Sequence, residues 1–298
     1  MDATDFAELT RRHHRELQVY CYRMLGSFEA AEDHVQEVFL RAWRSRHAFE
    51  ERASARTWLY RIATNACLDT LRRTSPPAQP YPDHLLDESP GPDAVAVGRE
   101  TMSLAFLAAI KLLPGRQRAV LILRDVLSWP ASEAAVLLGT SVAAVNSALH
   151  RARGTLRERW PGGRMEWAPA GEPDPAEREL LERYVAAHEN ADPQALIDLL
   201  REDVRLTIEP GVGEWNGKSE VAQVLREDMN TPGRWRMVPT AANGRPAVAS
   251  YVQRAGDPVF RPFALIVLEP EAGLLAAIDT FEAPRLFPAF GLPAILGP

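Results

Sequence analysis

Residues 131–159, ASEAAVLLGTSVAAVNSALHRARGTLRER, decide the fold of the middle of the chain. The first eight have the apolar spacing of a short helix, and Gly139 is a residue at which such a helix ends. Thr140 or Ser141 then offers a side-chain oxygen that can cap the next helix. The stretch therefore predicts two helices joined by a tight turn.

The second of these helices is expected to have one buried and one exposed face. Apolar residues at steps of three and four define the buried face: Val142, Val145, Leu149, Ala152 and Leu156. The exposed face begins with small residues and continues with arginines: Ser141, Ala143, Ala144, Asn146, Ser147, His150, Arg151 and Arg153. Small side chains permit close approach to a DNA major groove, amides and imidazoles can meet base edges, and guanidinium groups bind phosphates. An ordinary helical hairpin with a polar surface explains the same pattern.

Length and charge divide the chain into parts with different tasks. A chain of 298 residues predicts two or three domains. The net charge of −6 conceals an asymmetry, because residues 41–75 carry eight Lys or Arg against three Asp or Glu. Residues 165–298 carry twelve basic against twenty-one acidic side chains. The first half is therefore expected to face nucleic acid, and the last part has another task.

Several classes of protein are excluded by composition. The sequence has no run of eighteen apolar residues and no signal peptide at its start, so we expect a cytoplasmic protein without membrane association. Cys21 and Cys67 each lie inside a predicted helix, without a partner cysteine or a histidine at metal-ligand spacing. We expect both to be buried, with no metal site and no cofactor.

Before the helix pair, periodicity predicts helices at 5–25, from Phe28 onward and from Thr57 onward. The second leaves Asp33, Gln36 and Glu37 exposed. The third carries a basic face with a tryptophan near its start, at Arg56, Trp58, Arg61, Asn65, Arg72 and Arg73. Aromatic rings beside arginines can stack on unpaired bases and bind phosphate, although a buried tryptophan with solvated arginines is an equally simple explanation.

Three motifs in this order resemble the extracytoplasmic-function (ECF) sigma factors of bacterial RNA polymerase. They are DHVQEVF at 33–39, TWLYRIATNACLD at 57–69 and LPGRQR at 113–118, followed by the helix pair. The resemblance implies that Asp33, Gln36 and Glu37 bind the coiled coil of the polymerase largest subunit. It also implies that the loop around Phe49 and the basic helix hold single-stranded bases of the minus-ten element. The helix from Val142 would then bind the minus-35 element as duplex.

Two further segments complete the organisation. Residues 76–100 are rich in proline and acidic, which predicts an extended linker between the two DNA-binding regions. Its acidic residues either imitate nucleic acid in the polymerase cleft or only solvate a spacer. After a hinge at 161–175, two helices, a strand and a third helix precede strands at 235–241, 246–254, 262–268 and 274–281, an α+β pattern. This order resembles the cone-shaped SnoaL-like fold of polyketide cyclases and ketosteroid isomerases, which is found fused to sigma factors.

The predicted fold class is multidomain, with two all-α sigma domains followed by an α+β SnoaL-like domain. The boundaries are 1–75 for sigma region 2, 76–100 for the linker, 101–160 for region 4, 161–175 for the hinge, 176–285 for the regulatory domain and 286–298 for an apolar tail. The tail either packs an apolar edge against a partner domain or covers the pocket of its own domain.

The expected function is transcription initiation without catalysis. The chain would bind core RNA polymerase and promoter DNA, be a monomer when free, and be regulated in cis by its C-terminal domain. An alternative is a C-terminal isomerase, hydrolase or small-ligand sensor, for which Asp203, Trp215, Tyr251 and Asp279 are the candidate pocket residues. A ligand-responsive repressor is a third hypothesis, but it would not need the motif at Asp33.

Overall fold

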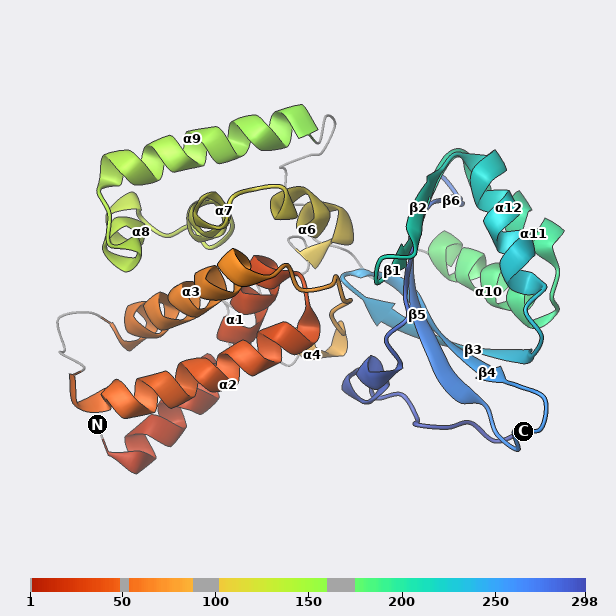
Figure 1. The fold of residues 1–298 in the computed structure, drawn as a ribbon, viewed down its shortest axis with the longest axis horizontal. Helices are drawn as coiled ribbons and strands as arrows, with labels where there is room; N and C mark the ends of the chain where they lie inside the picture. Colours follow the sequence, from red (N-terminus) through yellow and green to blue (C-terminus); the bar gives the residue numbers. More distant parts are fainter. Residues whose placement is uncertain (1, 49–53, 88–101, 160–174) are drawn as a thin grey trace. The chain divides into compact units, whose positions relative to one another are not determined.

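The computed structural model describes residues 2–48, 54–87, 102–159 and 175–298, which form two compact units (Figure 1). The first unit comprises Met1–Pro77 and Ser89–Ala168, and the second comprises Ala78–Glu88 and Pro169–Pro298. The first part of the predicted linker therefore belongs to the same unit as the C-terminal chain.

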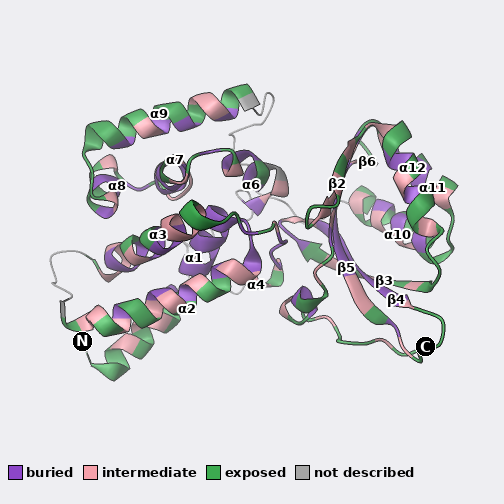
Figure 2. Ribbon diagram, in the orientation of Figure 1, coloured by how far each residue is buried: buried purple, intermediate pink, exposed green. Residues whose placement is uncertain are grey.

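The first unit begins with three amphipathic helices, α1 (Ala3–Leu25), α2 (Phe28–Ser45) and α3 (Ala55–Arg73), with a 3-10 turn at Arg46–Ala48. Each helix starts at a side-chain cap that accepts backbone N–H groups: Asp2, Ser27 and Ser54 respectively. Their apolar faces pack on one another, and Figure 2 shows buried residues facing inward along each helix. Cys21 and Cys67 are buried free thiols, as predicted.

The region from 102 onward continues the first unit with α6 (Leu104–Lys111), α7 (Gly115–Leu121), a π-helical turn (Ile122–Val126), α8 (Ala131–Leu138) and α9 (Val142–Arg159). Gly139 ends α8 with a left-handed φ of 59°, and the Ser141 hydroxyl accepts the Ala144 N–H at 3.2 Å. The helix, turn, helix prediction is confirmed. Val142 is 42% exposed rather than buried, because it lies at the open turn where α9 begins.

The second unit contains α10 (Pro175–Glu189), α11 (Pro193–Asp198), β1 (Leu200–Glu209), β2 (Gly213–Asn216), α12 (Lys218–Met229), β3 (Arg234–Ala242), β4 (Arg245–Gln253), β5 (Arg261–Glu271), β6 (Leu274–Phe281) and a 3-10 helix (Pro284–Phe290). The sheet order is β2-β1-β6-β5-β4-β3, with β1 parallel to β6 and the other pairs antiparallel. The three α-helices lie on one side of the curved sheet (Figure 1). The predicted α+β domain is confirmed.

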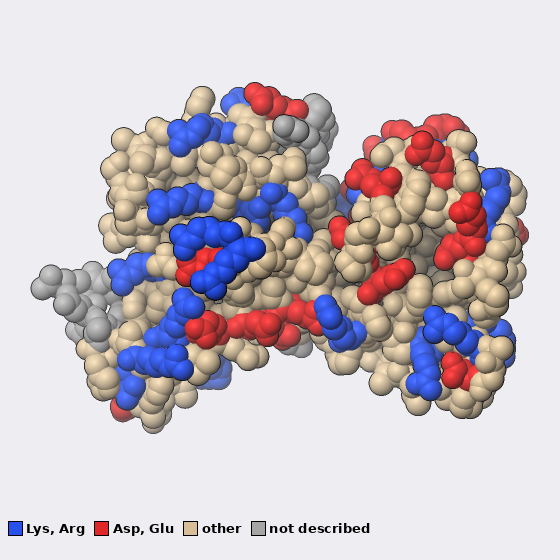
Figure 3. Space-filling model, in the orientation of Figure 1, with Lys and Arg blue, Asp and Glu red and all other residues tan. Residues whose placement is uncertain are grey.

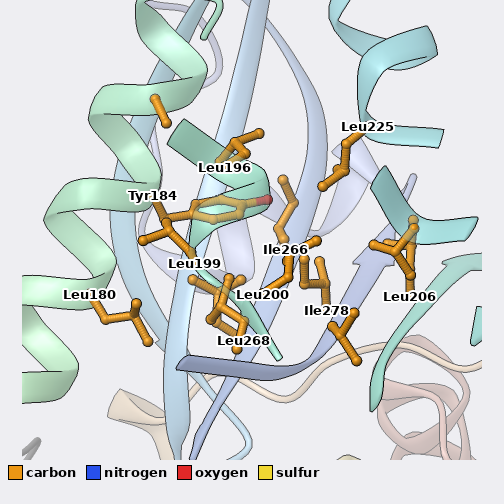
Figure 4. Packing of buried hydrophobic residues seen from close by; sticks show 14 of the residues in the cluster. Leu180, Tyr184, Leu196, Leu199, Leu200, Leu206, Leu225, Ile266, Leu268 and Ile278 are labelled. Atoms are coloured by element: carbon orange, nitrogen blue, oxygen red, sulfur yellow. The ribbon is translucent and has the colours of Figure 1, made fainter. Parts of the chain in front are cut away.

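The core of this unit lies between α10, α11, α12 and the sheet. Figure 4 shows Leu180 and Tyr184 of α10 pointing toward Ile266 and Leu268 of β5, with Leu225 supplied by α12. All five are buried, and they belong to one continuous apolar cluster. Burial of this cluster is the main contribution to holding the helices on the sheet.

Residues 78–87 pack on the turn between β3 and β4. Asn243 and Gly244 have φ values of 57° and 73°, the backbone that an Asn-Gly hairpin turn requires. The Asn243 side-chain oxygen accepts the Tyr81 N–H at 2.9 Å, and the Asn243 N–H donates to the Tyr81 carbonyl at 3.0 Å. The Asp83 carboxylate accepts the Gly244 N–H at 2.9 and 3.1 Å. A short helix, α4 (His84–Asp87), follows.

Within the described residues, no single helix is long and apolar enough to cross a membrane. The helices 131–138 and 142–158 reach that length and apolar composition only when taken together, and they meet at an angle of 99°.

Candidate polymerase, promoter and ligand sites

The exposed face of α2 presents the residues predicted for polymerase binding. Asp33 and Gln36 are exposed, and Glu37 is partly exposed and bonded to the Arg41 Nε at 2.6 Å. This hydrogen bond lowers the pKa of Glu37, so the carboxylate stays charged. Leu40 follows one turn after Gln36 and is 51% exposed, and this apolar residue lies outside the set predicted for polymerase binding. Asp33, Gln36, Glu37 and Leu40 are called the α2 face below.

The residues predicted for minus-ten binding divide into two groups. Figure 3 shows basic side chains gathered over α3, where the exposed residues are Arg61, Asn65, Arg72 and Arg73. Trp58 is only 8% exposed, which favours the alternative of a buried tryptophan beside solvated arginines in the described state. Phe49 lies outside the described residues.

Arg56, the remaining minus-ten candidate, is engaged inside the first unit. Its Nε donates to Glu16 Oε2 at 2.9 Å, and its guanidinium lies 5.3 Å from the Tyr60 ring and 5.4 Å from the Trp129 ring. Glu16 also pairs with His13. Although burial alone opposes ionisation, the hydrogen bonds from His13 and Arg56 lower the pKa of Glu16. Arg56 is thus held by an ionised partner rather than left free for phosphate.

Regions 2 and 4 are fastened together within this unit. Arg118, from the LPGRQR motif, donates to the Met24 carbonyl at 2.5 Å and to the Lys111 carbonyl at 2.9 Å. Burial lowers the pKa of this guanidinium to about 10. Trp129 is buried, with its ring 5.0 Å from that of Tyr60 on α3. Helix α3 is therefore covered by the segment that leads into α8.

The residues predicted for minus-35 binding form one continuous exposed surface on α9. All eight are exposed: Ser141, Ala143, Ala144, Asn146, Ser147, His150, Arg151 and Arg153. Arg153 differs from the others, because its guanidinium forms two hydrogen bonds with the Asp125 carboxylate, at 2.9 and 2.7 Å. These two bonds fix the orientation of the Arg153 side chain. Arg151 forms no such bond with Asp125.

The described part of the second unit contains a cavity of about 70 Å³ between its helices and its sheet. The walls are largely apolar, and the polar side chains include His188 and Tyr184 on α10, Asp228 on α12 and Glu282 after β6. The lining residues are Tyr184, His188, Ala191, Leu206, Ile208, Val224, Leu225, Asp228, Met229, Trp235, Met237, Ser250, Phe263, Ala264, Ile266, Ile278, Thr280 and Glu282.

None of the four predicted pocket residues lines this cavity, so that prediction is wrong. Asp203 is exposed and bonded to Arg201 at 2.8 Å, and Trp215 packs against the edge of the core. Tyr251 donates to the Pro293 carbonyl at 2.8 Å, and Asp279 pairs with Arg205 at 2.9 Å. For Tyr251 and Asp279 the cause is strand alternation: Ser250, Ile278 and Thr280 line the cavity, so their immediate neighbours point to the other face.

The apolar tail packs on that other face. The Phe287 ring meets the Tyr251 ring edge-on at 5.0 Å, and Leu286, Phe287 and Phe290 are buried. Leu296 forms a backbone bridge with Phe260. These contacts lie within the second unit, but no residue of the tail lines the cavity, so the tail does not cover the pocket of its own domain in this structure.

His188 is the most perturbed base of the cavity. It is 8% exposed, its ring meets the Tyr184 ring edge-on at 4.6 Å, and its Nε2 has no hydrogen-bond partner. Burial lowers its pKa to about 4. The imidazole is therefore neutral near pH 7 and can accept a proton or a hydrogen bond at Nε2.

This burial predicts a pH dependence of stability. Because the folded pKa lies below the unfolded value, the unfolded chain binds the proton more tightly, and acid favours unfolding. We expect the second unit to lose up to about 3 kcal/mol of stability between pH 7 and pH 4 through this residue. Urea unfolding at several pH values should show that the free energy of unfolding depends less on pH in His188→Leu than in the natural chain. The exposed His150→Leu serves as control, and equal pH dependence in His188→Leu and the natural chain would contradict the assignment.

Comparison with known proteins identifies the class. Residues 9–76 match the family described as Sigma-70 region 2, and residues 103–156 match Sigma-70, region 4. These two families place the chain among the transcription initiation factors. The chain is 39% identical over 316 residues to the ECF RNA polymerase sigma factor SigG of Mycobacterium tuberculosis (strain CDC 1551 / Oshkosh), covering 97% of this chain and 84% of SigG. It therefore belongs to the ECF RNA polymerase sigma factors, which bind core RNA polymerase and promoter DNA.

Similarity extends through the C-terminal unit. The ECF RNA polymerase sigma factor SigJ of Mycobacterium tuberculosis (strain ATCC 25618 / H37Rv) is 32% identical over 302 residues, covering 96% of this chain and 86% of SigJ. The crystal structure of SigJ aligns with a TM-score of 0.64 at 23% identity, covering 98% of this chain and all of that one. That alignment supports the fold of the whole chain, including the fused α+β unit.

Proposed function

We propose that this sigma factor uses three surfaces of its first unit. The α2 face binds core polymerase, the exposed residues of α3 bind the minus-ten element, and the exposed face of α9 binds the minus-35 element. Charge and accessibility support the assignment, since α2 offers ionised carboxylates beside an exposed leucine, while α3 offers arginines and an amide.

We further propose that the C-terminal unit inhibits the sigma regions in cis. The observation that carries this proposal is the binding of residues 78–87 to the β3–β4 turn through Tyr81 and Asp83. This segment follows α3 in the chain and leads toward region 4. A linker held in this way is not free to rearrange when the two DNA-binding regions move apart.

Separation of the regions is required by the geometry of a promoter. Elements about 25 base pairs apart lie about 85 Å apart along B-DNA. In the first unit, region 4 is instead fastened to region 2 through Arg118, and Trp129 covers part of α3. The described arrangement is therefore a closed state, which polymerase binding has to open.

In vitro transcription with core polymerase tests both statements. The full chain should initiate from a cognate promoter, and a chain ending after Arg164 should do so at a lower polymerase concentration, because its linker is no longer held. A truncated chain that binds polymerase normally but transcribes no better than the full chain would contradict cis inhibition. No transcription by either chain would contradict the assignment of the three surfaces.

The α9 surface predicts two kinds of variant. Asn146→Ala should change which minus-35 bases are tolerated, by about 1–3 kcal/mol at one position. Arg151→Ala should weaken all promoters alike and flatten the salt dependence, because a phosphate contact carries no base information. Binding profiles over single-base promoter variants measure both. An unchanged profile for Asn146→Ala, with only the affinity lowered, would show that the helix is oriented differently.

A further inference from the structure

The cavity of the C-terminal unit is not used by the function proposed above. Its walls are apolar and aromatic, with Trp235 and Phe263 meeting edge to face at 5.3 Å and with Met229 and Met237 beside them. Apolar cavities of this kind in folded domains bind small molecules, and a few convergent polar groups select among them.

One deeply placed polar group in this cavity lacks a partner. His188 is 8% exposed and lines the cavity, and its Nε2 makes no hydrogen bond. Because burial keeps the imidazole neutral near pH 7, it adds no positive charge that would oppose a cationic ligand.

The remaining charged groups of the cavity are acids. Asp228 and Glu282 both line it and both reach solvent, which places them at its opening. Partial burial raises the pKa of Asp228, and the nearby charge of Glu282 raises it further. None of the residues that line this described cavity is Lys or Arg, so no lining side chain offsets the two carboxylates.

We propose that this cavity binds a small apolar molecule that carries a protonated amine. The apolar part lies against Trp235 and Phe263, and the ammonium group donates to the carboxylates of Asp228 and Glu282. An ammonium group has three donors and no acceptor, which suits the two carboxylates at the opening. A cation also gains from the faces of the aromatic rings. An anionic ligand would be repelled by the two carboxylates.

The size of the cavity limits the ligand to a small aliphatic group. An engineered cavity of about 150 Å³ holds benzene in another protein, so a cavity of about 70 Å³ excludes an aromatic ring and admits a branched group of about four carbons, with its amine toward the opening. Isobutylamine, isobutanol and isovalerate are therefore suitable probes. They share an isobutyl group and differ in charge, which separates the contribution of the carboxylates from that of the apolar walls.

The test uses the full chain without polymerase, so its outcome does not depend on cis inhibition. Ligand-observed NMR and calorimetry near pH 7 should rank isobutylamine first, isobutanol about tenfold weaker and isovalerate without measurable binding. Equal binding of the three probes, or no binding of isobutylamine, would overturn the proposal.

Three variants assign the binding to this cavity. Asp228→Asn should reduce the preference for isobutylamine over isobutanol about fivefold or more, because it removes a charge at the opening. Asp203→Asn, at an exposed carboxylate that does not line the cavity, should leave the preference unchanged. Ala264→Leu should fill the cavity and abolish binding of both probes. Retention of the amine preference in Asp228→Asn would overturn the proposal even if Ala264→Leu failed to fold.

Discussion

A chain carrying Asp33→Lys and Glu37→Lys should fail to assemble with core RNA polymerase. Both residues lie on the α2 face, where Glu37 is held ionised by Arg41. If this face meets a basic groove of the polymerase, reversal of two charges places like charges against each other at a desolvated contact. Such contacts cost several kcal/mol, which corresponds to a loss of affinity of at least about 100-fold.

The fold should survive these substitutions. Asp33 is exposed, and the Glu37 to Arg41 pair is a surface pair on one helix, which contributes little to stability. Thermal unfolding of the double variant should therefore match that of the natural chain. A variant with Glu179→Lys and Glu182→Lys on the exposed side of α10 makes the same change in net charge elsewhere. Normal co-elution of the folded α2 variant with core polymerase would remove the assignment.

Leu40 extends the same test to an apolar contact. At 51% exposure it is a large apolar side chain with no cover in the described state, beside the charged residues of the α2 face. Leu40→Ala should weaken polymerase binding while leaving the charge unchanged. The sequence did not single out this residue, because periodicity alone cannot tell a leucine at the edge of a buried stripe from one that stands outside it.

Helices and strands were predictable here because their patterns are local. The faces of α9 follow from apolar spacing, and the left-handed turn follows from Gly139. The cavity residues were not predictable to the same degree. Tyr251 and Asp279 are each one position away from the cavity residues Ser250 and Thr280, and in a strand one position reverses the face. Without the register of the sheet, the sequence cannot decide which neighbour faces inward.

Long-range pairing was the second limit. Proline content predicted an extended linker, but no local pattern indicates that Tyr81 contacts Asn243, more than 160 residues later. Likewise, Arg56 and Trp58 were expected to face DNA because they lie in a basic segment. Their actual surroundings depend on Glu16 and on the region 4 segment around Trp129, which no local pattern connects to them.

The contact between the linker and the β3–β4 turn predicts the other large effect. Asn243→Gly removes the side-chain oxygen that accepts the Tyr81 N–H, yet glycine keeps the left-handed backbone of the turn. Asp83→Ala removes the carboxylate that accepts the Gly244 N–H. Together the substitutions should cost the contact about 2 kcal/mol, so that amides of residues 78–87 exchange hydrogen roughly 30-fold faster.

The same double variant should transcribe more than the natural chain when polymerase is limiting, because a released linker lowers the cost of opening the closed state. The control combines Ala272→Gly with Asp257→Ala. Ala272 and Gly273 form a turn with the same left-handed backbone between β5 and β6, but this turn does not hold the linker. Faster exchange at 78–87 with unchanged transcription would separate the contact from regulation and contradict cis inhibition. Unchanged exchange would show that the backbone bonds of Asn243 to Tyr81 and of Asp83 to Ala241 hold the segment without the side chains.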